Sequence, residues 1–515
     1  MISNNSTAAI SSTENESGYP TIPPFLPHQQ YPEFRNRLKT SKEQNVVYDL
    51  LRELMRNLGF DKKNASNPDW NPFSEIIKPG DKVLIKPNLV RHIHLTGGNY
   101  QTVVTHASLI RCVLDYVALA LKGHGEITVG DAPVQSTDFE NLVKKNNLNV
   151  ICEDVSNTWD IPVNLVDFRL WSVQLNEEHN VIGEKDLSGD SKGYRAVDLG
   201  KDSFLQQIAD SNRKFRITSY DSGDLQKHHN KEKNEYLIPK TVLDANVVIN
   251  LPKLKTHRKV AITAALKNLV GINGHKDWLP HHRIGSLKEG GDEYREPFSL
   301  KQLSTYLIES IDKNRDSILT KPKRFLLRII TRLIKHTAPD PYREGSWYGN
   351  DTLWRTVLDL NRLLIYADNQ GVMQDIPQRK CLTIVDGIIA GEREGPMEPD
   401  PRNVGVLIAG YNPVVVDAVI ATMIGFDYRK IPIIAKAFQN SRWPLANFNP
   451  QEIKILTKAD IWKELKVGKS CDELCFEPPS GWAGYVECEQ CGMKIKEANK
   501  KYQNDRLLKP DNDWL

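Results

Sequence analysis

Cationic side chains gather directly after an apolar segment near the middle of the chain. Residues 247–251 (VVINL) are followed by a turn that carries Lys253, Lys255, His257, Arg258 and Lys259. This density of positive charge suits a phosphate or carboxylate group. His257 is the candidate general acid or base, because a free imidazole titrates near neutral pH, although it could equally just cap the turn.

The apolar segment that follows keeps one lysine and one amide. Residues 260–270 (VAITAALKNLV) predict a helix that is apolar on nearly every face and is therefore buried. A buried Lys267 requires a carboxylate or an anionic ligand, and the adjacent Asn268 shares its position. The positive end of this helix would add to the attraction for anions. The alternative is a solvated lysine loop with one structural ion pair.

Polar side chains also occur where other apolar segments end. Lys86 and Asn88 close residues 82–88 (KVLIKPN), and Asp131 closes the apolar run in 126–133 (EITVGDAP). Taken alone, Lys86 could extend into solvent and Asp131 could cap a turn. Ligands bind at the carboxyl ends of parallel strands, so we expect an anion site there. Its candidate ligands are Lys86, Asn88, Lys253, Lys267 and Asn268.

Carboxylates occupy comparable positions in the second half of the chain. Asp386 ends an apolar run, Glu394 follows in a glycine-containing turn, and Asp417 lies in the first turn of an apolar helix. Together with Asp131 they could hold a divalent ion such as Mg²⁺, or transfer protons with shifted pKa values, Asp386 above all. Both roles fit these residue types. Asp386 and Asp417 are also the candidate partners of Lys267.

Four cysteines lie close together near the C-terminus, in the segments CDELC and CEQC. They are Cys471, Cys475, Cys488 and Cys491. Four thiolates in two pairs have the count for a tetrahedral zinc site. An iron–sulfur cluster fits the spacing less well, because the run C-x2-C-x2-C-x3-C-P is absent.

The elements that must position these side chains alternate along the chain. Apolar runs typical of strands buried on both faces occupy 82–88, 126–133, 247–253, 381–388 and 403–413. Helical patterns occupy 43–58, 107–121, 260–270 and 414–424. This order predicts an α/β fold with a mostly parallel central sheet flanked by helices.

We expect a single α/β domain over residues 41–460, with insertions at about 160–240 and 310–370. Residues 1–40 are rich in Ser, Asn, Thr and Pro and predict a disordered leader. Residues 461–515 form a C-terminal segment that carries the four cysteines.

Composition and charge argue against several classes of protein. The net charge of +3, from 68 basic and 65 acidic residues, gives no indication of nucleic-acid binding. No apolar run approaches the roughly 20 residues of a membrane span. The first residues lack the charged and apolar regions of a secretory signal. The other cysteines are scattered singly, so we expect a cytoplasmic protein.

Residues 321–336 (KPKRFLLRIITRLIKH) predict a basic amphipathic helix. The pattern suits a membrane surface or nucleic acid. Such a helix more often packs on its domain with a solvated basic face, which is what we expect here, rather than peripheral membrane contact.

These motifs in combination resemble the "domain of unknown function 362" proteins. The matching segments are VLIKPNLV, VGDAP, VINLPKLKTH with ALKNLVGI, VDGIIAGEREGP and NPVVVDAVIATMIGFD, within residues 72–437. The resemblance implies little chemistry, because the family has no agreed activity. Some members carry ferredoxin-like four-cysteine motifs, from which this chain departs. The family also resembles the N-terminal domain of nickel-pincer lactate racemases, which implies proton-transfer roles for Lys255 and His257.

Two functions are consistent with the sequence. The first is an enzyme acting on a small phosphate- or carboxylate-bearing substrate, with His257, Lys255 and Asp386 as catalytic candidates. The second is a zinc- or iron–sulfur-binding protein with a redox or structural role, centred on the late cysteines.

Overall fold

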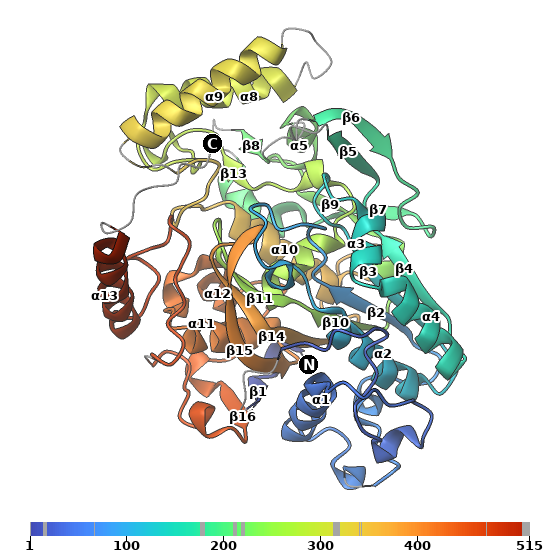
Figure 1. Ribbon diagram of the computed structural model, residues 1–515. Helices are drawn as coiled ribbons and strands as arrows, with labels where there is room; N and C mark the ends of the chain where they lie inside the picture. The colour runs from blue at the N-terminus through green and yellow to red at the C-terminus, as the bar shows by residue number, and fades with distance from the viewer. Residues whose placement is uncertain are drawn as a thin grey trace.

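A twisted sheet runs through the centre of the molecule, with helices on both of its faces (Figure 1). The computed structural model describes residues 2–13, 18–65, 67–175, 181–209, 214–217, 222–312, 320–338, 340, 342–469 and 471–506. The main strands lie in the order β16 (Lys454–Thr457), β1 (Thr7–Ser12), β15 (Glu398–Gly410), β14 (Lys380–Glu394), β10 (Val247–Leu251), β2 (Lys82–Pro87), β3 (Glu126–Asp131) and β4 (Val163–Asp167).

Most neighbouring strands of this sheet are parallel. β14, β10, β2, β3 and β4 pair in parallel from one to the next, whereas β15 is antiparallel to both β14 and β1. Both faces are buried: Val83 and Ile85 pack into one apolar cluster and Leu84 into the other. Strands buried on both faces need no polar alternation, which explains the continuous apolar runs. The prediction of a mostly parallel α/β sheet is confirmed.

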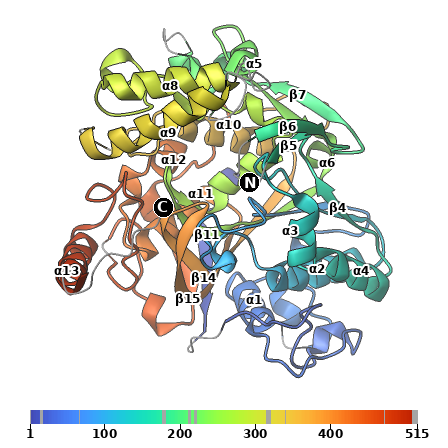
Figure 2. The same cartoon turned by 45° about the horizontal axis from the view of Figure 1, so that its top comes forward.

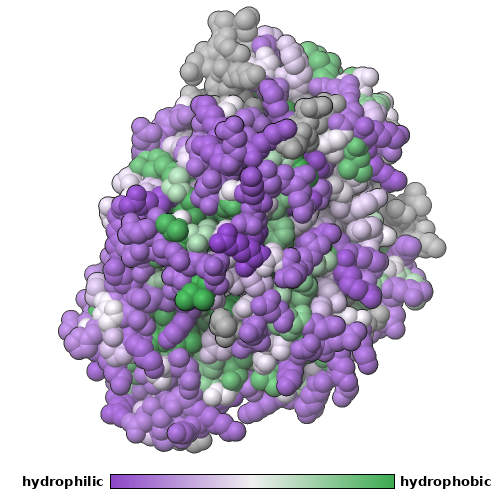
Figure 3. All heavy atoms as spheres, turned by 180° about the vertical axis from the view of Figure 1, so that it is seen from behind, coloured by the Kyte–Doolittle hydropathy of each residue, from purple (hydrophilic) through white to green (hydrophobic). Residues whose placement is uncertain are grey.

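Different helices cover the two faces. One face packs against α1 (Val46–Asn57), α2 (Ala107–Leu121) and α4 (Leu148–Trp159), with α3 (Phe139–Lys145) beside them. The other packs against α10 (Leu353–Tyr366), α11 (Pro413–Met423), α7 (Ala265–Asn268) and α12 (Pro432–Ala435). Seen from behind, hydrophilic side chains dominate the surface and apolar ones gather towards the middle of that face (Figure 3). None of the described helices is long and apolar enough to cross a membrane.

The prediction of a disordered leader is wrong for the described residues before 41. β1 lies between β15 and β16 and pairs with both. Ala8, Ala9 and Ile10 are fully buried, and Tyr19 and Phe25 pack into the core with α1 and α2. Local composition missed this because the hydrogen bonds of β1 come from strands about 400 residues away in sequence.

Both predicted insertions contain elements that belong to the main α/β fold. Residues 160–240 include β4, an edge strand of the main sheet, and residues 310–370 include α10, which is buried along its whole length. The rest of 160–240 forms strands of small two-stranded sheets and a short helix: β5 (Trp171–Leu175) with β6 (Val181–Asp186), β7 (Tyr194–Asp198) with β9 (Glu235–Pro239), β8 (Phe215–Arg216) with the later β13 (His282–Arg283), and α5 (Ser222–His228), with α6 (Lys240–Asp244) at its end. Residues 310–370 also contain the long helix α9 (Thr320–Thr337).

Candidate functional site

A cavity of about 300 Å³ opens beyond the carboxyl ends of β2 and β3. Its basic side chains come from the turn after β11 (Lys253–His257) and from the loops around α7. They are Arg258, Lys259, Lys267 and Lys276, together with the imidazoles of His257 and His281. Apolar side chains also line it, including Val90, Val134, Val270, Leu279 and Met397, as do the carboxylates of Asp131 and Glu344.

A buried ion pair joins the ends of the two strands. Lys86 Nζ lies 2.7 Å from Asp131 Oδ1, and the backbone N–H of Leu89 donates to the other carboxylate oxygen at 2.7 Å. Gly271 packs directly over the pair, since a Cβ at this position would lie 1.9 Å from Asp131 Oδ1. Asp131 is therefore held by Lys86 and Leu89.

The segment around Lys267 differs from the predicted long helix. Residues 261–263 form β12 (Ala261–Thr263), which pairs antiparallel with β11, and α7 contains only four residues. Asp417 accepts hydrogen bonds from the N–H groups of Ala265 and Leu266, at 2.7 and 3.0 Å. The positive end of α7 is thus closed by Asp417. Burial raises the pKa of this carboxyl group to about 7.

The predicted pairing of Lys267 with Asp386 or Asp417 is wrong. Asp386 pairs with Lys253 and Asp417 caps α7, while the Lys267 side chain lines the cavity. In the part of the chain that the structure describes, no hydrogen bond or ion pair reaches Lys267 Nζ.

Burial and mutual repulsion lower the pKa values of the cavity lysines. Burial, with Lys259 and Lys86 nearby, lowers the pKa of Lys267 to about 8. Burial, with Lys86, Lys267 and Arg169 nearby, lowers the pKa of Lys276 to about 7. Keeping these buried ammonium groups charged therefore costs free energy, and a bound anion would lower that cost.

Lys253 and Asp386 lie outside the cavity. Lys253 Nζ is 3.0 Å from Asp386 Oδ2 and 2.6 Å from the Tyr19 hydroxyl, and both charged side chains are fully buried. Tyr19 donates to Asp386, and the N–H of His106 donates to it at 2.8 Å. This cluster joins the N-terminal segment to the sheet, which is a structural role.

Lys255 is buried beside the cavity but is surrounded by carbonyl groups. Its Nζ donates to the backbone oxygen of Val103, to Pro396 O at 3.2 Å and to Asn88 Oδ1 at 3.4 Å. Burial and the neighbouring lysines keep its pKa well below the usual value. Asn88 Nδ2 in turn donates to Asn268 Oδ1 at 3.1 Å, and both amides line the cavity.

Backbone contacts hold the two imidazoles in opposite tautomers. His257 Nδ1 accepts the N–H of Lys259 at 3.0 Å, so the neutral ring carries its proton on Nε2. His281 Nδ1 donates to the carbonyl of Leu279 at 2.7 Å, which leaves Nε2 as an acceptor. Burial and nearby lysines hold the pKa of both rings well below the usual range. The Nε2–H of His257 is therefore a hydrogen-bond donor, whereas Nε2 of His281 is an acceptor that can take up a proton.

Sequence reasoning missed Lys276, His281 and Thr263. Thr263 is buried in the cavity wall, and among the described residues its hydroxyl has no hydrogen-bond partner. Residues 274–282 (GHKDWLPHH) are rich in cationic and imidazole groups, and this density was a usable signal.

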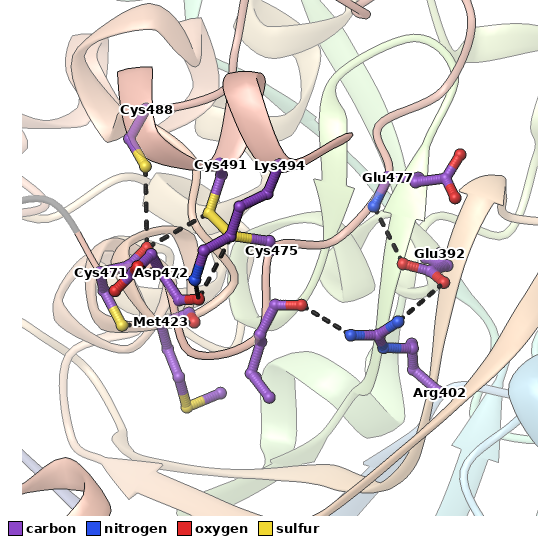
Figure 4. Close-up of a disulfide and its surroundings, with 11 residues drawn as sticks. Glu392, Arg402, Met423, Cys471, Asp472, Cys475, Glu477, Cys488, Cys491 and Lys494 are labelled. Carbon is purple, nitrogen blue, oxygen red and sulfur yellow. Dashed lines mark hydrogen bonds and ion pairs between the residues drawn. A yellow bond between two sulfur atoms is a disulfide. The ribbon is translucent and has the colours of Figure 1, made fainter. Parts of the chain in front are cut away.

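None of the four late cysteines lines the cavity, and Figure 4 shows how they lie relative to one another. Cys475 and Cys491 form a disulfide, while Cys471 and Cys488 are free thiols. The tetrahedral site predicted from the sequence uses all four thiolates, so that prediction now concerns only the reduced protein.

The carboxylates are likewise dispersed. Glu394 accepts the N–H of Ser480 at 2.7 Å, and so holds the C-terminal segment. Asp131, Asp386 and Asp417 each have a different partner. Among the described residues, no group of three or more His, Cys, Asp or Glu side chains is placed to hold a metal ion. The carboxylates therefore do not form the Mg²⁺ site considered above.

Comparisons with known proteins give the relatives of this chain. The family model "Domain of unknown function (DUF362)" matches residues 83–184 and 180–422. The "Thylakoid-associated protein sll1697" of Synechocystis sp. is 24% identical over 361 residues, which cover 70% of this chain and 68% of that protein. A crystal structure of a Thermotoga maritima protein matches at 11% identity with a TM-score of 0.28, over 69% of this chain and 54% of that one.

Proposed function

Because the chain belongs to the DUF362 family, whose description assigns no activity, we propose its function from the cavity alone: it binds a small phosphate- or carboxylate-bearing molecule. The observation that carries this proposal is that Lys259, Lys267 and Lys276, with Arg258, line one cavity beside two carboxylates, Glu344 and Asp131. The nearest strand-end carboxylate, Asp131, already pairs with Lys86. An anionic ligand would supply negative charge beside these lysines. Thr263 and the side-chain amides of Asn88 and Asn268 would orient it by hydrogen bonds.

The size and lining of the cavity restrict the ligand further. A volume of about 300 Å³ is at the lower end of small-molecule sites. Apolar side chains such as Val134, Leu279 and Met397 line the same cavity as the cations. The geometry favours a metabolite-sized anion with a short hydrocarbon portion.

We propose further that His257 and His281 transfer protons to and from this ligand. His281 Nε2 would accept a proton as general base, and the Nε2–H of His257 would donate one as general acid. Depressed pKa values keep both rings neutral at pH 7, which is the state that this exchange requires. The reaction class supported is proton transfer beside a phosphate or carboxylate group.

Titration calorimetry of the full-length protein with inorganic phosphate at pH 7.0 tests the binding step. Saturable binding is expected, weakened in Lys267→Ala and Lys276→Ala and unchanged in Lys144→Ala, which removes an exposed lysine of α3. No saturable binding by the wild type, or equal binding by all three variants, would reject an anion site.

The catalytic step needs a separate readout. Small phosphate esters and hydroxycarboxylates are incubated in D₂O with the wild type, His257→Gln or His281→Gln, and C–H exchange is followed by NMR. Exchange that requires both histidines supports the proposal. Phosphate binding without exchange in any compound would leave a binding protein and reject the acid–base roles.

A further inference from the structure

Two antiparallel helices form a hairpin at one end of the molecule (Figures 1 and 2). They are α8 (Ser299–Asp312) and α9 (Thr320–Thr337). Ile330 and Ile334 of α9 pack with Leu307 of α8 in a small apolar cluster, separate from the two main core clusters. This narrow contact accounts for one side of α9 only.

A second apolar stripe of α9 faces away from that contact. Phe325, Leu326, Ile329 and Leu333 are 66%, 42%, 40% and 45% exposed. Successive helical residues turn by about 100°, so the centre of the stripe formed by Phe325, Ile329 and Leu333 lies about 120° around the helix from Ile330 and Ile334. Large apolar side chains aligned in this way indicate a surface that contacts something else.

Cations border this exposed stripe. Residues 320–337 contain six lysines and arginines and no acidic residue. Lys321, Arg328 and Arg332 are exposed and, by the same helical geometry, lie along one edge of the stripe. This segment has far more positive charge than the whole chain, whose net charge is only +3.

We propose that α9 lies flat on an anionic lipid surface, with Phe325, Ile329 and Leu333 inserted between the headgroups and the basic edge against their phosphates. An apolar face beside a purely basic one is typical of helices that lie in the membrane interface. A protein partner would need an acidic rim to match this helix, which carries no acidic residue of its own. Charge complementarity therefore favours anionic lipid. The earlier expectation that α9 only packs on its domain accounts for Ile330 and Ile334 but leaves this stripe unexplained.

Co-sedimentation of the full-length protein with vesicles tests the proposal. Vesicles of phosphatidylcholine alone are compared with vesicles containing about one third phosphatidylglycerol, at low and high salt. Binding is expected only to the anionic vesicles and is expected to weaken with salt, because headgroup attraction is screened. Hydrogen exchange within 320–337 should slow when the anionic vesicles are present.

Two variants separate the apolar and electrostatic contributions. Phe325→Ser/Ile329→Ser/Leu333→Ser removes the stripe, and Lys321→Glu/Arg332→Glu reverses charge along the edge; each should lower vesicle affinity at least tenfold. The matched controls change exposed residues elsewhere: Val372→Ser/Ile376→Ser for the apolar side chains, and Lys144→Glu/Lys454→Glu for the charges. Both controls should bind as the wild type does, and circular dichroism should show all four folded.

Three results would overturn the proposal. The first is a wild type that does not bind the anionic vesicles at low salt. The second is a stripe variant that binds as tightly as the wild type. The third is a wild-type dimer that becomes monomeric in the stripe variant, which would show that a second copy of the chain covers this face.

Discussion

At the residue scale, the cavity depends on individual ammonium groups that form no ion pair with a carboxylate of the described residues. Lys267 and Lys276 line the same cavity as His257 and His281. Removing one charged hydrogen-bond donor from an anion costs about 1.5–3 kcal/mol, which weakens binding by about 10- to 150-fold. We expect Lys267→Ala and Lys276→Ala each to raise the Kd for inorganic phosphate by a factor in this range, measured by titration calorimetry at pH 7.0. A change under about threefold in both variants would contradict this estimate of their role.

The same lysines should make anion binding depend on pH. The pKa values of Lys276 and Lys267, about 7 and 8, place their loss of charge just above neutrality. Sulfate is the suitable probe, because its own charge stays constant. Its Kd should rise from pH 6.5 to pH 9, and binding near pH 7.5 should take up protons, measured by calorimetry in buffers of different ionisation enthalpy.

Lys276→Arg provides the matched variant, because a guanidinium group stays charged throughout this range. Its sulfate affinity should fall less between pH 6.5 and pH 8 than that of the wild type. A pH-independent Kd in the wild type would show that these ammonium groups do not hold the anion.

At the scale of elements, Asp417 ties α7 to α11. A folded-state pKa of about 7, against an ordinary value of 3.8, means that the folded chain binds more protons than the unfolded chain between these values. The contribution of Asp417 to stability is therefore complete below pH 4 and is lost as the pH rises to 7. Asp417→Asn lacks this titration. Urea unfolding should show the wild type losing stability relative to the variant from pH 5 to pH 7, by up to about 1.4 kcal/mol per pH unit. Parallel pH profiles of the two proteins would contradict the shifted pKa.

The start of α13 (Glu489–Arg506) carries the disulfide partner Cys491. Closing a loop of about 15 residues stabilises a protein by about 3 kcal/mol, so dithiothreitol should lower the thermal midpoint.

The sequence-based metal prediction is tested in the same reduced sample: one zinc per chain is expected, and Cys488→Ser should lose it. A reduced protein that stays free of zinc and iron after metal exposure would reject it.

At the scale of the whole molecule, the N-terminal segment is part of the central sheet. β1 supplies hydrogen bonds to both β15 and β16, and Tyr19 bonds to the Lys253–Asp386 pair. Deletion of residues 1–19 removes both β1 and Tyr19, which would expose the edge of β15 and leave that pair partly unsatisfied. We expect a lower thermal midpoint and aggregation in size-exclusion chromatography. A disordered leader would predict an unchanged midpoint, so the two views give opposite results.

Much of the fold was predictable from local pattern. Residues 107–121 were predicted as a helix and form α2, and the runs at 82–88 and 126–133 form β2 and β3. Their continuous apolar character directly reflects burial on both faces of a sheet. The same reasoning misread 260–270, because an apolar run is also satisfied by pairing β12 with β11.

The sequence by itself determined that cations and carboxylates end the buried strands, and hence that a charged site lies at one edge of the sheet. Only the tertiary structure decided which charges neutralise each other. It pairs Lys253 with Asp386 and Lys86 with Asp131, and leaves Lys267 and Lys276 facing the cavity. It also brings His281 and His257 to the lining of one cavity. The type of a residue shows that a buried charge needs a partner. The identity of that partner depends on contacts between segments far apart in sequence, and no local sequence pattern contains these contacts.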